Sequence, residues 1–378
     1  MHSFHRALLA LSMIATTPGA LFSQTAPTGG APAGRSKAQD SPPNRAELVQ
    51  RGLAYYKTAQ APDGSFSAAA GPGVTAIAAA AMLQCGQPPD DPVVARALQY
   101  VQQHIRPDGG VYAEGSTHKN YETCIAIFAF AAANSDGRYN EAIKKAEAFL
   151  RLEQWDEGEG LAQGDLAFGG SGYGSHSRPD LSNTAFLIEA LRTAGTSPED
   201  PAIQRALAFV SRCQNLETAA NTTQFAGKNP DGGFYYTIAA GGSSPAGNTE
   251  EGGLRSYGSM TYAGLKSMIY AGVDKQDDRV KAARQWIGEN YTLAENPGMG
   301  TAGLYYYYHT FAKTLDALGD QTLTDAAGQK HDWRRDLVEA LAASQQPDGS
   351  WINSNQRWLE ADPNLVTGYS LLALSYCD

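Results

Sequence analysis

The sequence of 378 residues lacks any run of basic residues, and this absence narrows the range of partners. Lys and Arg number 29 against 39 Asp and Glu, which gives a formal net charge of −10 at pH 7. An acidic chain without a basic run, or a stripe that mixes aromatic and basic residues, is a poor match for nucleic acid or an anionic membrane surface. We therefore expect neither as a partner.

Only one apolar run stands out, and it is too short to span a membrane. ALLALSMIA at 7–15 follows one Arg and two His residues and comes shortly before Pro18 and small residues, a pattern typical of a secretory signal peptide. No Cys follows the run, so a lipid anchor is not expected. We predict a signal peptide at 1–23, a flexible linker rich in Ala, Pro, Gly and Ser at 24–44, and an exported protein, periplasmic or extracellular.

Several motifs of common enzyme classes are also missing. The chain has no GxSxG, HExxH, Walker A or dinucleotide-binding GxGxxG motif in a suitable context. GGSGYG at 169–174 is rich in Gly, but no helix with phosphate-binding spacing follows it directly. We expect no cofactor on these grounds.

What the chain does contain is one turn that recurs. The clearest copies are QAPDGSF (60–66), RPDGGVY (106–112), NPDGGFY (229–235) and QPDGSW (346–351), with looser copies at 168–174 and 296–306. Pro stops a helix and Gly accepts a positive φ, so each copy predicts a tight turn after a helix. Six copies indicate one structural unit repeated six times.

The segments around each turn have two different helical patterns. The segment before the first turn is amphipathic, whereas the segment after it is apolar nearly all round, which is typical of a helix buried on every side. We expect amphipathic outer helices at 45–60, 91–105, 139–154, 200–214, 277–291 and 332–345, and buried inner helices at 73–85, 120–133, 181–194, 256–271, 302–318 and 364–377. Each inner segment carries a Thr near its start: Thr75, Thr123, Thr184, Thr261, Thr310 and Thr367.

Six hairpins with doubly buried helices favour a closed ring over an open solenoid. An open stack would expose its terminal inner helices, and no polar capping repeat is visible. We therefore predict an all-α fold, an (α/α)6 barrel that forms a single domain over residues 45–378.

This pattern resembles a known family. RGLAYYKTAQAPDGSF (51–66) resembles the QW motif of squalene and hopene cyclases, with Phe66 in place of the usual Trp, and parts of the motif recur at 205–214 and 345–351. The same toroid occurs in protein prenyltransferase β subunits and in thioester domains of complement-like proteins. The resemblance covers nearly all of the chain after the linker. Its motifs are structural, so it implies the toroid fold and is weak evidence for an activity.

The family's catalytic motifs are incomplete here. Cyclases that protonate an alkene use a DxDD run before the inner-helix Thr. The run at 180–183 keeps its first Asp but has Ser182 at the proton-donor position, and a Ser hydroxyl is too weak an acid for that step. The pairs Asp90-Asp91 and Asp277-Asp278 start outer helices and are most simply helix N-caps. No DDxxD run is present.

Prenyltransferases and thioester domains fit no better. Prenyltransferases hold Zn²⁺ with a D-x-C pair and a His on the next inner helix; only His309, in a YHT segment, matches, while Tyr257 and Ser259 stand where D-x-C is expected. We therefore predict no metal site, and His309 is otherwise a cavity-wall or hydrogen-bonded core histidine. The run at Cys85 lacks the Glu of a thioester CGEQ motif, and Gly86 is explained as the residue that ends a helix.

A toroid gathers the starts of its inner helices at one end, where we expect a cavity mouth. Two long Gly-rich connections, 156–180 and 239–256, are expected to cover it. The predicted ligand-binding residues are Glu122, Asp180, Asn183, Tyr257, Tyr306 and His309, of which Asp180, Glu122 and His309 are also catalytic candidates.

Two functional interpretations remain open. The first is a divergent or non-catalytic toroid that binds a small hydrophobic or extracellular ligand. The second is an enzyme on the same barrel, active on a polyprenyl compound or on a glycan, with Glu122 and Asp180 as the carboxylate pair that glycan hydrolysis needs. Asp180 follows Pro179 and is equally well explained as a helix cap.

The chain has four cysteines, and we predict that two of them form a disulfide. Cys85 and Cys377 each lie ten residues beyond the Thr of the first and last inner helix, and ring closure makes those helices neighbours. Export makes oxidation plausible. The alternative is that both are buried free thiols, since free Cys is among the most buried residue types. Cys124 and Cys213 lie in units that are not neighbours and are expected to stay free.

Overall fold

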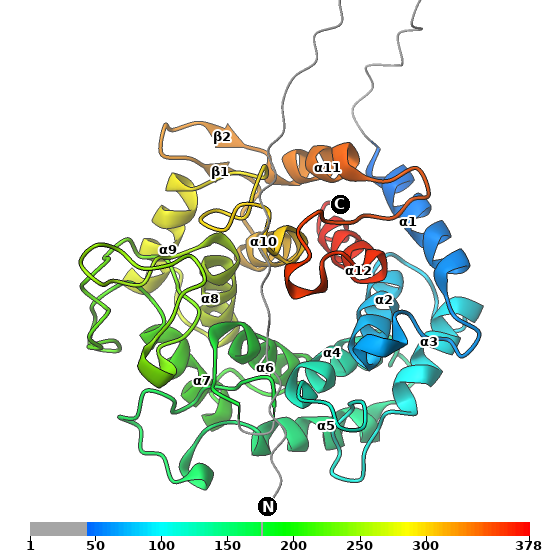
Figure 1. Ribbon diagram of the computed structural model, residues 1–378, viewed down its shortest axis with the longest axis horizontal. Helices are drawn as coiled ribbons and strands as arrows, with labels where there is room; N and C mark the ends of the chain where they lie inside the picture. Colours follow the sequence, from blue (N-terminus) through cyan, green and yellow to red (C-terminus); the bar gives the residue numbers. More distant parts are fainter. Residues whose placement is uncertain (1–43, 175–176) are drawn as a thin grey trace, which may run out of the picture. The chain divides into compact units, whose positions relative to one another are not determined.

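The computed structural model describes residues 44–174 and 177–378, which form one ring of paired helices (Figure 1). The outer helices are α1 (Arg45–Ala59), α3 (Pro92–Gln102), α5 (Asn140–Leu152), α7 (Pro201–Arg212), α9 (Asp278–Glu289) and α11 (Trp333–Ser344). The inner helices are α2 (Pro72–Gln84), α4 (Lys119–Ala132), α6 (Leu181–Thr193), α8 (Gly258–Tyr270), α10 (Leu304–Leu318) and α12 (Pro363–Leu374). The predicted (α/α)6 barrel of twelve helices is confirmed. The predicted signal peptide and nearly all of the linker lie outside the described residues.

Other regular structure in the described residues is minor. A two-residue hairpin of β1 (Leu323–Thr324) and β2 (Lys330–His331) pairs antiparallel, with Leu323 opposite His331. Four single-turn 3-10 helices lie in connections: η1 (Ala68–Ala70), η2 (Glu157–Glu159), η3 (Ala239–Gly241) and η4 (Arg357–Leu359). None of the described helices has the length and apolar character needed to cross a membrane.

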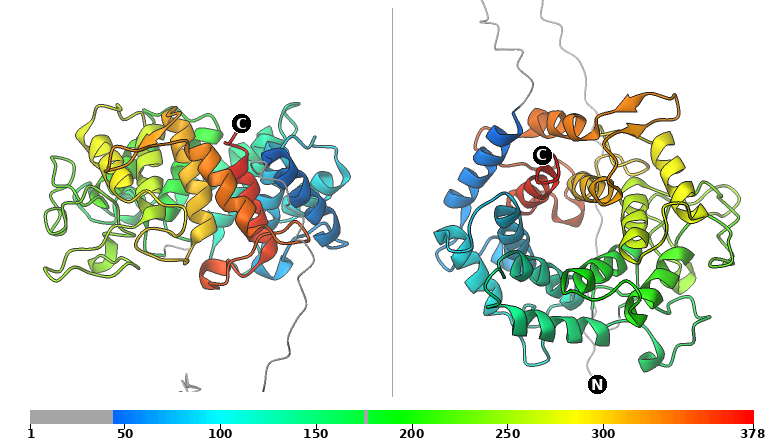
Figure 2. Two further views of the ribbon diagram at one scale, coloured as in Figure 1. Left: turned by 90° about the horizontal axis from the view of Figure 1, so that it is seen from above. Right: turned by 180° about the vertical axis from the view of Figure 1, so that it is seen from behind.

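The two rings differ in burial as the sequence pattern predicts. Inner helix α2 buries every residue from Pro72 to Met82, whereas outer helix α7 buries one face only. Each inner helix packs against the next, and α12 packs against α2, so the inner ring closes. Figure 2 shows the same arrangement from the side and from behind.

The recurring Gly explains why the turn is repeated. Gly64, Gly109, Gly232 and Gly349 all have φ between 77° and 92°, a conformation that L side chains rarely adopt. Each also presses on the backbone of the next outer helix: a Cβ on Gly64 would lie 2.5 Å from the Arg96 carbonyl oxygen. Gly349 makes the same contact with Arg51 of α1, so the last turn joins the first unit.

A recurring Gln and the recurring Thr tie each turn in place. Gln60 at the end of α1 donates from Nε2 to the carbonyls of Gly64 and Val93, and Gln345 does the same with Gly349 and Leu48. The Thr hydroxyl on the inner helix accepts from a backbone N–H just after the turn. The pairs are Thr75 with Phe66 (2.8 Å), Thr123 with Val111 (2.9 Å), Thr184 with Ser171 (2.9 Å), Thr261 with Phe234 (3.1 Å) and Thr367 with Trp351 (3.1 Å). In the fifth unit, Thr310 donates to the Tyr306 carbonyl, the same i−4 bond that Thr123, Thr184 and Thr261 make.

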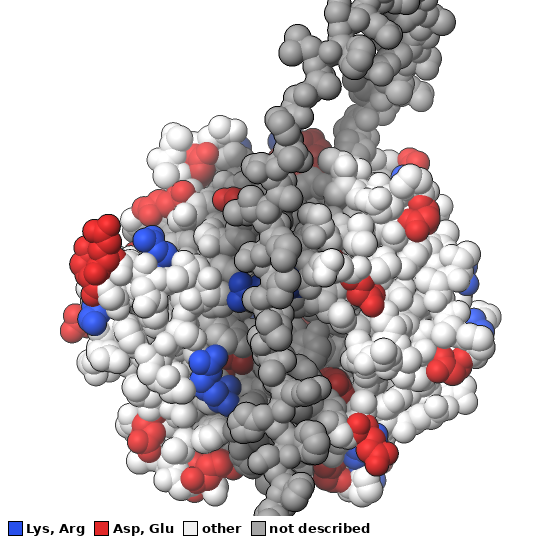
Figure 3. All heavy atoms as spheres, in the orientation of Figure 1, with Lys and Arg blue, Asp and Glu red and all other residues white. Residues whose placement is uncertain are grey.

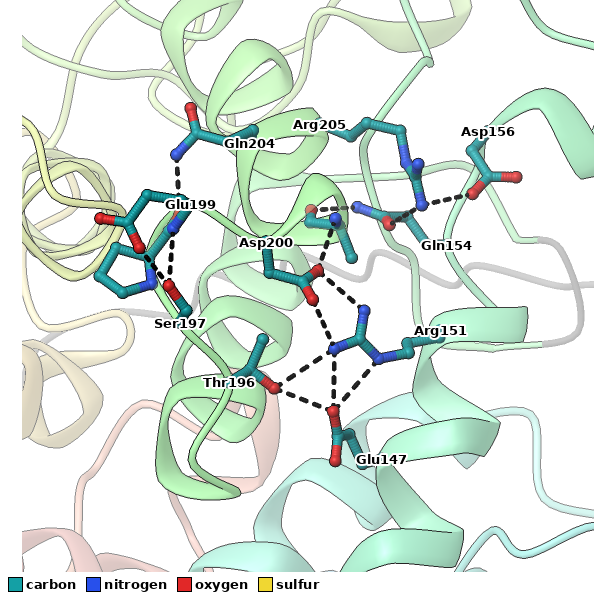
Figure 4. A network of polar contacts seen from close by, with 12 residues as sticks. Glu147, Arg151, Gln154, Asp156, Thr196, Ser197, Glu199, Asp200, Gln204 and Arg205 are labelled. Atoms are coloured by element: carbon teal, nitrogen blue, oxygen red, sulfur yellow. Dashed lines mark hydrogen bonds and ion pairs between the residues drawn. The ribbon is translucent and has the colours of Figure 1, made fainter.

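Polar contacts also join neighbouring outer helices. Arg151 at the end of α5 reaches Glu147 on its own helix and Asp200, the N-cap of α7 (Figure 4). Asp91 and Asp277 likewise cap α3 and α9, as the sequence predicts. On the face shown in Figure 3, Lys and Arg form separate small patches among acidic and uncharged residues.

The predicted disulfide is not formed in this structure. Cys85 and Cys377 are both free thiols, as are Cys124 and Cys213. Cys85 caps α2, and its Sγ donates to the Leu371 carbonyl of α12. The prediction placed Cys377 on the last inner helix, but α12 ends at Leu374 and the Cys377 thiol turns back to the Ala373 carbonyl. The assumption that Cys85 and Cys377 occupy equivalent positions on the first and last inner helices is therefore wrong.

Candidate ligand-binding cavity

A cavity of about 600 Å³ opens where the inner helices begin. All six inner helices contribute to its wall, at or near the positions just before the recurring Thr. The residues from these helices and their N-caps are Gly71, Gly73, Val74, His118, Tyr121, Glu122, Ser182, Asn183, Phe186, Tyr257, Ser259, Met260, Tyr306, Leu365 and Tyr369. The predicted cavity mouth is thus present, and it contains four of the six predicted ligand-binding residues.

The deeper wall is a chain of contacting aromatic rings. Phe186 lies between Tyr121 and Tyr306, at centroid distances of 5.3 and 6.0 Å, and Tyr369 lies 5.9 Å beyond Tyr306. Their hydroxyls pair with groups within the wall: Tyr121 with Tyr369 at 3.1 Å and Tyr306 with Ser182 at 3.0 Å. The rings therefore present apolar faces and few uncommitted polar groups to a bound molecule.

Glu122 is one of three carboxylate residues that line the cavity, with Glu114 and Glu360, and it is held by nearby donors. Its Oε1 accepts from the Ser116 hydroxyl at 2.7 Å and its Oε2 from the Ala113 N–H at 2.8 Å. Burial raises the pKa of Glu122, and these two donors act in the opposite direction. Both oxygens are therefore engaged as acceptors, as they are in an ionised carboxylate.

Asp180 is buried and does not line the cavity. It caps α6: its Oδ1 accepts from the Asn183 N–H at 2.9 Å and its Oδ2 from the Asn183 side-chain amide at 2.8 Å. Tyr236 also hydrogen-bonds to it. Burial raises the pKa of Asp180 to about 6, against the effect of these donors. The structure therefore favours the helix-cap interpretation and does not bring Asp180 and Glu122 together on one cavity wall.

His309 also lies outside the cavity wall, in the core of the ring. It stacks on Tyr369 at 5.9 Å, and its Nδ1 has no hydrogen-bond partner. Burial lowers the pKa of His309 to about 3, and Lys313 contributes to this shift, so the imidazole is neutral near pH 7. Between a cavity-wall histidine and a hydrogen-bonded core histidine, the structure fits a core position. It differs from that interpretation in that Nδ1 of His309 has no hydrogen-bond partner.

Beside His309 lies a buried ionic cluster that the sequence did not indicate. Glu189 of α6 pairs with Lys266 of α8 and Lys313 of α10. Burial alone would raise the pKa of Glu189, but the two ammonium groups outweigh it and lower this pKa to about 2. The cluster joins three neighbouring inner helices below the cavity wall. Elsewhere in the described residues, no group of three or more His, Cys, Asp or Glu side chains is placed to hold a metal ion.

Comparisons with known proteins identify others with a similar architecture. A family model of the squalene-hopene cyclase C-terminal domain matches residues 67–239. A solved type II terpene cyclase from Scytonema, in complex with its product merosterolic acid A, aligns with a TM-score of 0.50 at 15% identity over 88% of this chain and 96% of that chain. The chain has the α/α toroid fold of the terpene cyclase and prenyltransferase superfamily.

Other toroids are similar to the same extent. A glycosyl hydrolase family 88 protein from Bacteroides vulgatus aligns with a TM-score of 0.53 at 12% identity, covering 88% of this chain and 97% of that chain. A protein from Actinoplanes aligns with a TM-score of 0.51 at 16% identity, covering 88% and 99%. At such identities the likeness concerns the fold alone. No curated protein matches the sequence.

Parts of this toroid's mouth were not predicted from the sequence. The connections 156–180 and 239–256 were expected to cover the mouth, yet among their described residues only Tyr173 lines the cavity. The short connections around 113–118 and 358–360 line it instead. Trp358 and Leu359 both have positive φ, 55° and 65°, and are 42% and 45% exposed. Exposed apolar residues in a strained backbone next to a mouth suggest a functional role.

Glu360 is another buried carboxylate of the cavity wall, and it also went unpredicted. Its Oε1 accepts from the backbone N–H groups of Tyr305 and Tyr306, and its Oε2 from the Asn353 amide. Glu360 thus caps α10 from another segment of the chain, because the N-cap residue Gly303 has no side chain to do so. A cap that comes from a residue 54 positions away from Tyr306 leaves no local sequence signal.

Proposed function

We propose that this toroid is an exported protein that binds an apolar molecule in the cavity at the start of its inner helices. The observation that carries the proposal is the cavity itself, about 600 Å³, with a wall of aromatic rings whose hydroxyls mostly pair with one another. Cavities of this size and lining suit molecules with a large apolar surface. The predicted signal peptide supports export.

The chemistry of the wall supports binding over acid catalysis. Ser182 lines the cavity at the position where the resemblance to cyclases requires a proton donor. Two of the three carboxylates of the wall, Glu122 and Glu360, are buried and accept a hydrogen bond at each oxygen, whereas Glu114 is exposed. An acid that protonates an alkene must present its proton to the substrate, and in Glu122 and Glu360 every oxygen is already directed at a donor of the protein.

Glycan hydrolysis by Glu122 and Asp180 has less support. Both carboxylates would have to face one substrate across 5–10 Å or so. Asp180 is enclosed by Asn183 and Tyr236 and is absent from the cavity wall.

Binding can be tested by titrating the mature protein with a hydrocarbon such as farnesene and recording tryptophan and tyrosine fluorescence. Tyr306→Ala removes a ring from the middle of the wall and is expected to weaken binding about tenfold or more, since burial of an aromatic contact contributes at least 1–2 kcal/mol. Tyr55→Ala is the matched control, because Tyr55 lies on outer helix α1 and outside the cavity wall. Absence of saturable binding to the unmodified protein, or equal losses in the two variants, would contradict the proposal.

A further inference from the structure

Among the described residues that line the cavity, one buried side-chain polar atom has no hydrogen-bond partner. Asn183 is 1% exposed and lines the cavity, and its Oδ1 forms no hydrogen bond in the structure. A buried acceptor left without a donor costs about 1–3 kcal/mol, so such atoms are rare and call for an explanation. A ligand that donates a hydrogen bond to this oxygen would remove that cost.

The orientation of the Asn183 amide is fixed by Asp180. The amide nitrogen donates to Asp180 Oδ2 at 2.8 Å, and Asp180 Oδ1 accepts from the backbone N–H of Asn183. Tyr236 donates a further hydrogen bond to Asp180. A carboxylate only accepts, so an amide turned the other way would set two acceptors against each other. The unpartnered atom is therefore the acceptor Oδ1. This gives Asp180 the role of a positioning residue.

A hydroxyl donor lies on the neighbouring inner helix. Ser259 is 3% exposed and also lines the cavity. Its Oγ accepts from the Asn296 amide at 3.3 Å, and within residues 44–174 and 177–378 its own proton has no acceptor. Asn183 and Ser259 both lie in the first turn of their helices, α6 and α8, which pack against each other.

A hydroxyl group satisfies both residues. An alcohol hydroxyl can donate to Asn183 Oδ1 and accept from the Ser259 hydroxyl. A carboxylate has no proton for Asn183, an ammonium has no lone pair for Ser259, and a hydrocarbon satisfies neither. Around these two residues the wall is apolar and aromatic, with Tyr257, Met260 and Phe186.

We propose that the cavity selects an apolar alcohol, whose hydroxyl binds between Asn183 Oδ1 and Ser259 Oγ while its hydrocarbon body lies against the aromatic wall. This inference rests on the proposed binding of apolar molecules and specifies the class of ligand. It assigns Asn183 and Ser259 as the residues that determine specificity.

The test compares three probes that share one skeleton: farnesol, farnesyl methyl ether and the hydrocarbon farnesene. The ether can accept a hydrogen bond but cannot donate one. The unmodified protein is expected to bind farnesol about tenfold more tightly than the other two, which corresponds to the gain from one or two buried hydrogen bonds. Ser259→Ala and Asn183→Leu should each reduce this preference to within about twofold while binding of farnesene is kept.

Ser267→Ala is the matched control, because it makes the same change on α8 at a buried Ser whose hydroxyl is already bonded to Ala263 O at 2.7 Å. It should keep the full preference. If Asn183→Leu does not fold, Ser259→Ala alone decides the result. Equal binding of all three probes to the unmodified protein would overturn the alcohol inference and leave the proposed function standing, whereas binding of none would refute the proposed function itself. A preference that survives Ser259→Ala and Asn183→Leu would overturn the assigned subsite.

Discussion

At the scale of single residues, the carboxylates near the mouth have structural roles that are easily mistaken for catalytic ones. Asp180 caps α6 and fixes the Asn183 amide, and Glu360 caps α10. Both are buried at helix N-termini, where the helix dipole and unpaired N–H groups favour a negative charge. Burial together with a helix cap thus accounts for Asp180, which the sequence also offered as a catalytic candidate.

Asp180 gives a prediction about pH. Its folded pKa of about 6 lies above the ordinary value of 3.8, so the folded state binds the proton more tightly than the unfolded state. The contribution of Asp180 to stability therefore falls as pH rises from 4 to 6 and is constant above that range. Urea unfolding at pH 4, 5, 6 and 7 gives the free energy of unfolding of the unmodified protein and of Asp180→Asn. The difference between the two should decrease by about 2–3 kcal/mol from pH 4 to pH 7.

Asp277→Asn is the control, because Asp277 is also an N-cap but Arg279 lowers its pKa. Asp277 therefore stabilises the folded state above the ordinary pKa of an Asp, and this stabilisation is lost as the pH falls further into the acid range. The stability difference between the unmodified protein and Asp277→Asn should thus change with pH in the opposite direction to that for Asp180→Asn. A flat difference for Asp180→Asn across pH 4–7 would contradict the assignment.

At the scale of the element, the repeated turn is a joint between units and not only a link within one. Gly349 belongs to the turn after α11, yet it presses on Arg51 of α1. Gln345 at the end of α11 donates to Leu48 of α1 in the same region. The turn therefore fixes the distance between consecutive outer helices, which is why the same residues recur in each unit.

Two glycines allow this role to be measured. Gly349 and Gly86 have nearly the same φ, 92° and 85°, but a Cβ at Gly349 would lie 2.3 Å from the Arg51 carbonyl oxygen, while a Cβ at Gly86 would meet nothing within 4 Å. We expect Gly86→Ala to cost about 1 kcal/mol, the cost of the left-handed conformation alone. Gly349→Ala should cost about 3 kcal/mol or more, because the backbone must also shift. Guanidinium unfolding measures both costs. Equal losses of unfolding free energy in Gly86→Ala and Gly349→Ala would show that the joint does not depend on the close contact between Gly349 and Arg51.

At the scale of the whole molecule, a closed ring of six units brings six helix starts together around one cavity. No single unit forms a site: the wall takes at least one residue from each inner helix. The toroid can therefore keep its structural repeats while the residues before each Thr change, and with them the chemistry of the cavity.

The whole-molecule prediction concerns catalysis. Mature protein incubated with squalene is expected to give no cyclised product, and with prenyl diphosphate, acceptor peptide and Zn²⁺ no prenylated peptide, since Ser182, Tyr257 and Ser259 occupy the positions of the family's acid and zinc ligands. Gas chromatography and mass spectrometry of the products would detect either reaction. Turnover that disappears in Asp180→Asn or His309→Ala would contradict this prediction and the binding role proposed for the cavity.

The sequence by itself determined the ring, because the turn, the Gln and the Thr recur at matching places and each acts through contacts within its own unit or with the next. It also located the mouth, since the residues before each Thr had to meet there. Tertiary structure alone decided which of these residues face the cavity. Asp180 turned inward as a cap, His309 packed in the core, and Trp358 and Glu360 reached the mouth from a distant connection. Those outcomes depend on packing between segments far apart in the chain, which no local pattern of residues records.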